Sequence, residues 1–262
     1  MDRLIFTALS GQAAVAQRMQ QISNEIANVS TTGFKRTFAS AVQTYKYKGD
    51  GFESRYVSVV TPPMGIDMRP GAMQATGRGL DISLTGTQLL GVAAPEGGVA
   101  YTRRGDLQVS NDGTLRIGTG EAVVDEGGTP ISIPPLSEVK VGTDGTVLIL
   151  PQGGTAGTFI PLTRMQIVEP QQTKDIEMRP DGLYKPAAGK TFAAAASPGV
   201  QSGVLEGSNT NLFSTMVDMI SMSRRYEMSV KVLKQASRRV ISPSVVRAWP
   251  DSISSRPIFL EL

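Results

Sequence analysis

The chain lacks both cysteine and histidine over its 262 residues. Without cysteine it can form neither disulfides nor thiolate nucleophiles, and without histidine it has no imidazole base and lacks the commonest protein ligand of zinc, copper and haem. Chemistry through carboxylates or a Ser-Lys pair remains conceivable, but nothing in the composition favours it. We therefore expect no catalytic residues, no metal site and no cofactor.

The sequence also lacks a large excess of one charge sign and lacks long apolar runs. The 26 basic and 23 acidic residues give a net charge of +3 and lie scattered along the sequence, without the basic stripe of a nucleic-acid-binding protein. The longest uncharged stretches, such as residues 82–95, contain polar residues and fall short of the ~20 apolar residues that span a bilayer. Asp2 and Arg3 precede only a brief apolar run, so no cleavable secretory signal is recognisable. We expect neither a nucleic-acid partner nor membrane insertion.

The N-terminal region has a helical pattern of apolar and small residues. They recur in steps of three and four at Leu4, Ala8, Gly11, Val15, Met19, Ile22 and Ile26. This spacing predicts an amphipathic helix over 4–26, about 35 Å long, with its apolar residues in one stripe. Asn28 and the turn-forming run 30–33 are expected to end it.

A second, longer stripe lies near the other end of the chain. Its members follow a heptad-like pattern: Leu212, Met216, Met219, Ser223, Tyr226, Val230, Leu233, Ser237 and Val240. The pattern predicts a helix that Ser208 or Asn209 caps and Pro243 terminates. Arg224 and Arg225 could contact an acidic partner, but a solvated helix face is the interpretation we favour.

Between the two predicted helices the sequence has the pattern of short β-strands separated by turns. Asp-Gly pairs at 112–113, 144–145 and 181–182 favour turns with positive φ. Strands are expected at 100–109, 114–117, 139–141, 146–150 and 164–168. The predicted fold class is α+β, mainly β, with a β-rich central domain between two terminal helices. Because an isolated helix is marginal in water, each stripe needs a partner, either the β domain of its own chain or a neighbouring subunit. Periodicity leaves both alternatives open.

One motif is specific enough to indicate a family. The segment SNEIANVSTTGFK, residues 23–35, resembles the N-terminal signature of the axial flagellar family, which includes rod, hook and hook-associated proteins. Gly33 suits the sharp turn that follows the helix. Glu25 stands where the family usually has asparagine, so we expect a different polar contact there.

Further blocks resemble the same family in the same order. Residues 71–92 and 100–115 resemble the entry into its β domain and the next hairpin, and residues 203–211 and 216–233 resemble its C-terminal block. Turn, strand-edge and hairpin positions are expected at Gly71, Thr76, Gly77, Asp81, Gly86, Tyr101, Thr102, Arg103 and Gly105. The opening, residues 1–11, is more similar to proximal rod members than to distal rod or hook members. The resemblance covers residues 1–237, and residues 238–262 are interpreted as a divergent tail or the product of a shifted reading frame.

The resemblance implies a structural subunit of the bacterial flagellar basal body, in the proximal rod. It implies a helical layer from residues 1–34 and 204–242 that pair as a coiled coil, an extended linker over 35–70, a β-rich outer domain over 71–203 and a tail over 243–262. The terminal helices would polymerise with other rod proteins and with further copies of the chain, transmit torque and wall the export channel. Export through the flagellar type III apparatus would need no cleaved signal. The expected subunit-interface residues are Leu4, Ala8, Val15, Met19, Ile22, Ile26, Asn28, Gly33, Phe34, Leu212, Met216, Met219, Tyr226, Val230 and Leu233.

Two alternatives accompany this prediction. The first is a distal rod or hook subunit of the same family. The second is a secreted β-rich hydrolase of the cell wall that uses a carboxylate pair such as Asp81 and Asp106.

Overall fold

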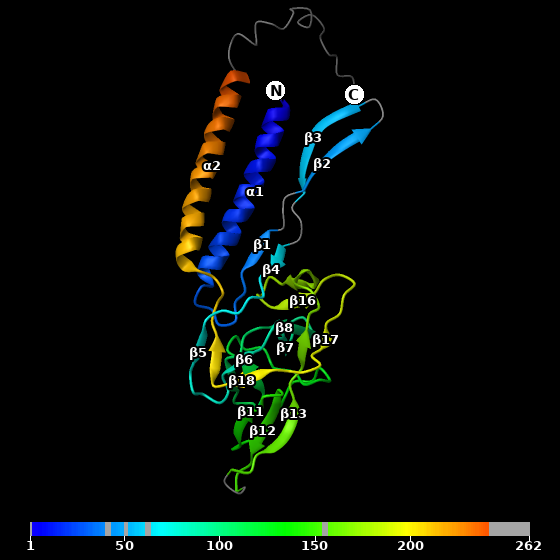
Figure 1. Ribbon diagram of the computed structural model, residues 1–262, viewed down its shortest axis with the longest axis vertical. Coiled ribbons are helices and arrows are strands. Elements are labelled where there is room, and N and C mark those ends of the chain that lie inside the picture. The colour runs from blue at the N-terminus through cyan, green and yellow to red at the C-terminus, as the bar shows by residue number, and fades with distance from the viewer. Residues whose placement is uncertain (1, 40–42, 50–51, 61–63, 154–156, 241–262) are drawn as a thin grey trace, which may run out of the picture. The chain divides into compact units, whose positions relative to one another are not determined.

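The computed structural model describes residues 2–39, 43–49, 52–60, 64–153 and 157–240. The chain divides into two compact units. One, the terminal unit, comprises residues 1–20, 43–60 and 217–262, and the other, the β unit, comprises residues 21–42 and 61–216. Helix α1 (Asp2–Ala27) opens the described chain and helix α2 (Leu212–Val240) closes it, with strands between them (Figure 1). The α+β class, mainly β, is confirmed.

Helix α1 forms where the first apolar stripe predicts it. No proline interrupts residues 2–27, and the helix ends as expected in a turn. The Asn28 N–H donates to the Asn24 carbonyl at 3.1 Å and the Thr31 N–H donates to the Asn28 carbonyl at 3.1 Å. The chain then leaves the helix through Gly33, which has φ +70°.

Helix α2 also forms as predicted, but its cap is a different residue. Asn211 accepts a hydrogen bond at its Oδ1 from the Ser214 N–H at 3.2 Å, which is the geometry of a helix N-cap. The expectation of Ser208 or Asn209 as the cap is therefore wrong. Asn209 bonds elsewhere, as described below, and Ser208 Oγ accepts from the Thr210 N–H. Pro243 and the predicted tail lie outside the described residues.

Strands occupy much of the range 35–70, which the sequence predicts as an extended linker. In the terminal unit, β2 (Gln43–Gly49) and β3 (Phe52–Val60) pair antiparallel, with a register irregularity between Lys46 and Lys48. In the β unit, β1 (Thr37–Ala39) pairs antiparallel with β4 (Met64–Ile66).

The β unit is built from short antiparallel strands. Its largest sheet has six strands in the order β15-β16-β8-β7-β14-β17, and β11-β12-β13 form a three-stranded sheet. The six strands are Ile176–Met178, Tyr184–Pro186, Val99–Thr102, Leu89–Ala93, Ile167–Glu169 and Ala193–Ala194, in that order. The three are Glu138–Val141, Thr146–Leu150 and Ile160–Arg164. A 3-10 turn, η1 (Thr173–Asp175), precedes β15.

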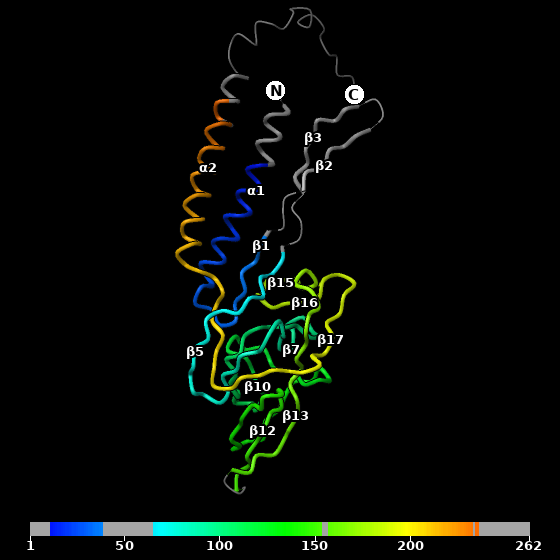
Figure 2. The backbone as a smooth tube through the Cα atoms, viewed as in Figure 1, coloured from blue at the N-terminus to red at the C-terminus, as the bar shows by residue number. Residues whose placement is uncertain are grey.

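Three two-stranded ladders complete the β unit. Strand β5 (Met73–Ala75) pairs with β19 (Val204–Glu206), and β6 (Ile82–Leu84) pairs with β18 (Val200–Ser202). Strand β9 (Leu107–Val109) pairs with β10 (Leu115–Ile117). The first two ladders pair β18 and β19, which lie just before α2 in the sequence, with β6 and β5. Figure 2 shows the course of the chain through β5.

Two apolar clusters form the core of the β unit, and β7 contributes to both. Leu90 and Val92 belong to the larger cluster, whereas Leu89 belongs to the smaller one with Ile66 and Tyr184. Because successive side chains of a strand point to opposite faces, β7 places apolar residues on both sides of its sheet. This explains why its sequence is a continuous apolar run and not an alternation.

The strand predictions are right where a turn bounds them, but two of the expected strands are each divided into two. Strand β12 coincides with the expected 146–150, and the glycines of the three Asp-Gly pairs have φ of +79° to +82°. The expected strand 100–109 is instead two strands, β8 and β9, separated by residues 103–106. Residues 164–168 are likewise divided between β13 and β14. The first interruption arises because Arg103 is buried in a polar site.

Candidate functional site: a buried polar junction

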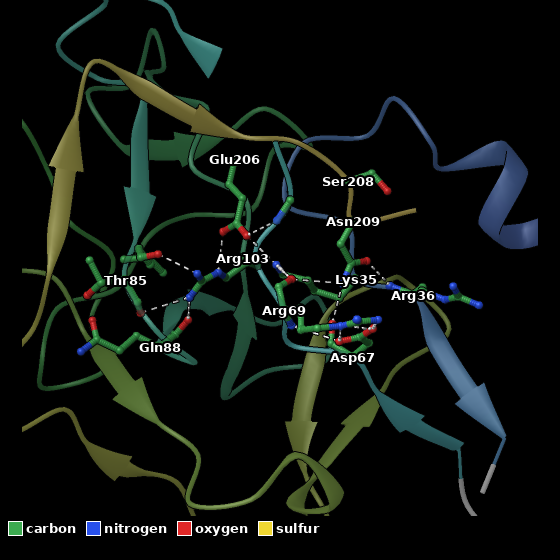
Figure 3. Close-up of polar contacts among 12 residues, drawn as sticks. Lys35, Arg36, Asp67, Arg69, Thr85, Gln88, Arg103, Glu206, Ser208 and Asn209 are labelled. Atoms are coloured by element: carbon green, nitrogen blue, oxygen red, sulfur yellow. Dashed lines mark hydrogen bonds and ion pairs between the residues drawn. The ribbon is translucent and has the colours of Figure 1, made fainter. Parts of the chain in front are cut away.

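Three charged residues meet in the interior of the β unit, and we call them the buried junction. Lys35 follows the turn after α1, Arg103 follows β8, and Glu206 is the last residue of β19. Their side chains are no more than 1% exposed. Figure 3 shows the Glu206 carboxylate directed toward both cations.

Glu206 is the centre of the buried junction. Lys35 Nζ donates to Glu206 Oε1 at 2.5 Å, and Arg103 Nε donates to Glu206 Oε2 at 2.8 Å. The Gly71 N–H also donates to Oε1, at 3.0 Å. Both carboxylate oxygens therefore accept charge-assisted hydrogen bonds, as a buried ion needs if it is to remain charged.

The buried junction holds two cations and one carboxylate, so backbone carbonyls receive the remaining donors. Arg103 Nη1 donates to the Gln88 carbonyl and Arg103 Nη2 to the Leu84 carbonyl, each at 2.6 Å. Lys35 Nζ donates to the Arg69 carbonyl at 2.8 Å. The excess positive charge thus lies against oriented carbonyl dipoles, and Glu206 supplies the negative charge of the buried junction.

The charges set the direction of the Glu206 titration. Burial alone would raise the pKa of this carboxyl, but Arg103 and Lys35 outweigh burial and hold the pKa below its usual value of 4.5. Burial lowers the pKa of the Lys35 ammonium, and its hydrogen bond to Glu206 opposes that shift. Nearby, burial raises the pKa of Tyr184, whose ring belongs to the smaller apolar cluster. Glu206 therefore keeps its negative charge throughout the neutral pH range.

Backbone hydrogen bonds and Asn209 join the same chain segments around the buried junction. Asn209 Nδ2 donates to the Asp67 carbonyl at 2.7 Å, and Asn209 Oδ1 accepts from the Arg36 N–H at 2.8 Å. The Gly33 N–H donates to the Glu206 carbonyl at 2.7 Å. Segments 33–36, 67–71 and 206–209 are thus fastened to one another next to the end of α1.

Two glycines allow the backbones to approach this closely. A Cβ at Gly33 would lie 2.4 Å from the Arg103 carbonyl oxygen, and a Cβ at Gly71 would lie 2.1 Å from the Gly207 carbonyl oxygen. Gly33 also has φ +70°, a conformation that L-residues adopt at a cost. The sequence prediction that Gly33 makes a turn in which a side chain would be strained is confirmed.

Glu25, which departs from the family pattern, makes its own buried contacts. Its side chain lies 3.6 Å from Arg36 Nη2 and is 2% exposed. Gln21 Nε2 donates to Glu25 Oε1 at 3.4 Å and to Thr37 Oγ1 at 2.8 Å. The last turns of α1 are therefore attached to residues 36–37 by polar side chains.

The predicted interface residues differ in how far the chain itself covers them. In α1, Ile22 is buried, and Val15, Met19 and Ile26 are half-buried. Gly33 is buried, and Asn28 and Phe34 are half-buried. The side chains of Leu4, Ala8 and Leu233 lie outside the described part.

In α2 the predicted stripe is more open to solvent. Leu212 and Val230 are half-buried. Met216, Met219 and Tyr226 remain 45%, 36% and 37% exposed.

Sequence reasoning missed the ionic core of the site. Lys35, Arg103 and Glu206 each stand inside a block that resembles the axial family, but none of them is among the predicted interface residues. The available signal was a charged residue within two positions of a glycine, in segments that otherwise have the pattern of turns and strands: Gly-Phe-Lys, Thr-Arg-Arg-Gly and Leu-Glu-Gly.

The carboxylates considered for a hydrolase are engaged in structural contacts. Asp81 and Asp106 face each other in a β-bridge. Arg104 donates to both oxygens of Asp106 at 2.8 Å, and Arg78 lies 3.4 Å from Asp81. Among the residues that the structure describes, no cluster of three potential metal ligands occurs. Nor does the described part contain a helix with the length and apolar character needed to cross a bilayer.

Comparison with known families defines the class of protein. Three family descriptions match in sequence: "Flagella basal body rod protein" over residues 5–35, "Flagellar hook protein FlgE/F/G D1 domain" over 83–149, and "Flagellar basal body rod FlgEFG protein C-terminal" over 201–239. Each matched block contributes one residue of the buried junction, namely Lys35, Arg103 and Glu206. The class is therefore that of structural subunits of the flagellar axis.

Individual relatives narrow the class. The chain is 35% identical over 239 residues to the flagellar basal-body rod protein FlgF of Salmonella typhimurium strain LT2, covering 89% of this chain and 93% of the relative. It is 34% identical to FlgF of Escherichia coli K12 over the same shares, and 27% identical over 254 residues to FlgG of Buchnera aphidicola subsp. Schizaphis graminum, covering 89% of this chain and 95% of the relative.

The chain belongs to the flagellar basal-body rod protein family and is FlgF-like. It is a structural rod subunit of the flagellar basal body and not an enzyme, so the hydrolase alternative is set aside.

Proposed function

We propose that this rod subunit polymerises through its terminal helices, which pair as coiled coils within and between subunits. In this proposal residues 1–34 and 204–242 form the inner layer that walls the export channel and transmits torque, and residues 71–203 form the outer domain. The neighbours are other rod proteins and further copies of the chain. The subunit reaches the rod through the flagellar export apparatus.

The observation that carries the proposal is the exposed stripe of α2. Met216, Met219 and Tyr226 are between 36% and 45% exposed although they fall on one heptad face. A fully buried side chain of this size stabilises a contact by roughly 1.5–3 kcal/mol. Several such residues in each subunit therefore provide a strong drive toward assembly once a neighbouring helix covers them.

The buried junction supports the mechanical part of the proposal. It joins the residues that follow α1 to the strand that precedes α2 through buried ion pairs and backbone hydrogen bonds. A load applied to either helix end is then carried into the β unit by a packed network and not by a flexible loop.

The proposal predicts that charges on the α2 stripe block assembly. The double substitution Met219→Asp and Val230→Asp should leave the β unit folded but reduce the chain recovered in isolated basal bodies by at least tenfold, because carboxylates cannot be buried between helices without a partner. Recovery is measured by immunoblot, together with swimming motility.

The matched control places two charges on another side of the same helix. Ser214→Asp with Ser229→Asp should change recovery by less than twofold, because the helical twist turns both positions well away from the Met219 and Val230 stripe. Normal incorporation of the Met219 and Val230 double variant would show that this stripe is not an interface.

A further inference from the structure

Helix α2 carries a second apolar line that the heptad pattern does not include. Val217, Ile220 and Met228 are 65%, 55% and 57% exposed. At 3.6 residues per turn they fall on one side of the helix, rotated by about 150° from the stripe that contains Met219 and Tyr226. We call these three residues the outer line of α2.

The outer line is more exposed than the heptad stripe of the same helix. Its least exposed member is 55% exposed, whereas Met219 and Tyr226 are 36% and 37% exposed. A helix with one apolar stripe needs one neighbour, but a helix with two stripes on different sides needs two. The outer line therefore calls for a contact in addition to the one made by the heptad stripe.

The charge of α2 argues against another α2 as the neighbour. The helix contains six basic and two acidic residues, and the helical twist places Arg224 on the same side as the outer line. Two such helices side by side would place like charges close together. Helix α1 contains two basic and two acidic residues, so its approach is not opposed by charge.

Helix α1 also has a surface that suits the outer line in size. Ala13, Ala16 and Gln20 are spaced by three and four residues and are exposed. The short side chains of Ala13 and Ala16 let large residues from a partner helix enter between the ridges of α1. Because this α1 face and the outer line are both exposed in the same chain, they do not cover each other within it.

We propose that Val217, Ile220 and Met228 of one copy pack against the Ala13, Ala16 and Gln20 face of α1 in a second copy. The contact is heterologous, with different surfaces on the two partners, so it repeats from copy to copy without closing on itself as a two-fold dimer does. The inference deepens the proposed function and rests on it, since it names the partner of one additional face of the same helices.

Cysteine cross-linking tests the contact directly. The chain has no native cysteine, so single substitutions provide unique thiols. Chains with Ala16→Cys and chains with Ile220→Cys are expressed together, basal bodies are isolated, and a short bismaleimide is applied. We expect a dimer of this chain that contains one cysteine of each kind, at least fivefold above the control mixture of Gln17→Cys and Arg225→Cys. Both control positions are exposed, and the helical twist turns them about 100° or more away from Ala16 and Ile220.

The other outcomes contradict the contact in distinguishable ways. Chains present in basal bodies with no cross-link above the control, with dimers only between two chains that both carry Ile220→Cys, or with cross-links only to a different protein would overturn it and leave the proposed function intact. Absence of the wild-type chain from basal bodies would overturn both.

A substitution that fills the α1 face gives a second measurement. Ala16→Phe should lower recovery in basal bodies about tenfold because the ring occupies the space that Ile220 needs. Gln17→Phe should change recovery less than twofold, because that position already carries a long side chain. Equal thermal unfolding of the two purified variants excludes a folding defect. Equal recovery of both variants would overturn the proposal.

Discussion

Replacing Glu206 by Gln is expected to lower the free energy of unfolding by about 3–5 kcal/mol, the usual consequence of removing one partner from a buried ion pair. The substitution keeps the shape of the side chain but leaves Lys35 and Arg103 buried, both 1% exposed or less, without their anion. Urea unfolding of the full chain, followed by circular dichroism, measures the change.

The control is an ion pair of the same type in the same unit. Glu177 and Lys185 lie 3.3 Å apart with side chains 40% and 51% exposed, and exposed pairs contribute about 0–1 kcal/mol. Glu177→Gln should therefore have little effect. If both substitutions changed stability equally, the buried junction would have no special role.

Lys35→Met is expected to be less damaging than Glu206→Gln. It removes one of two cations, and Glu206 still accepts from Arg103 and from the Gly71 N–H. The order of the two losses of stability therefore tests whether the single carboxylate is harder to replace than one of the two cations of the buried junction.

The pH dependence of the same variants gives an independent readout. The pKa of Glu206 in the folded chain is below its usual value of 4.5, so its contribution to stability is present above about 4.5 and is lost as the pH falls through the lower, folded-state value. The stability difference between wild type and Glu206→Gln should accordingly shrink on acidification below pH ~4.5. A constant difference down to the acid limit would contradict the assignment.

Gly33→Ala should be more destabilising than a glycine-to-alanine change at a position with the same backbone conformation and free space around it. The added Cβ would combine a left-handed φ of +70° with a contact of 2.4 Å to the Arg103 carbonyl oxygen. Left-handed backbone and overpacking each cost about 1–3 kcal/mol, so we expect a loss of about 3 kcal/mol or more in urea unfolding.

Gly77 provides the matched control for this substitution. It has φ +72°, and no atom lies within 4 Å of where its Cβ would be. Gly77→Ala should therefore show the conformational cost alone, about 1 kcal/mol. Losses of similar size at both positions would mean that the close approach to Arg103 is relieved by a small shift of the backbone.

The sequence is sufficient to locate the helices because their signal is local. Steps of three and four from Leu4 to Ile26 and from Leu212 to Val240 are read within a single element, and both helices form there. The turns at the three Asp-Gly pairs are predictable for the same reason. Strand ends are less predictable, since the break after β8 depends on Glu206, a partner 103 residues away from Arg103.

The buried junction could not be predicted because each of its residues looks ordinary by itself. Lys35 and Arg103 read as solvated charges of a turn and a hairpin, and burial of such residues is rare. Asn209 shows the same ambiguity: its position before α2 suits a cap, but its amide bonds to residues 36 and 67. Local pattern cannot decide between two hydrogen-bonding roles when the second partner is 142 residues away.

The bond between Lys35 and Glu206 closes a loop of 171 residues. Long loops close late in folding, since their chain entropy is lost before distant contacts can compensate it. A polypeptide that ends before β19 would hold Lys35 and Arg103 with no anion between them, so it could not complete its interior. Only a chain that extends through β19 can therefore join the residues after α1 to Glu206, and a fragment that ends earlier cannot form the buried junction of an intact copy.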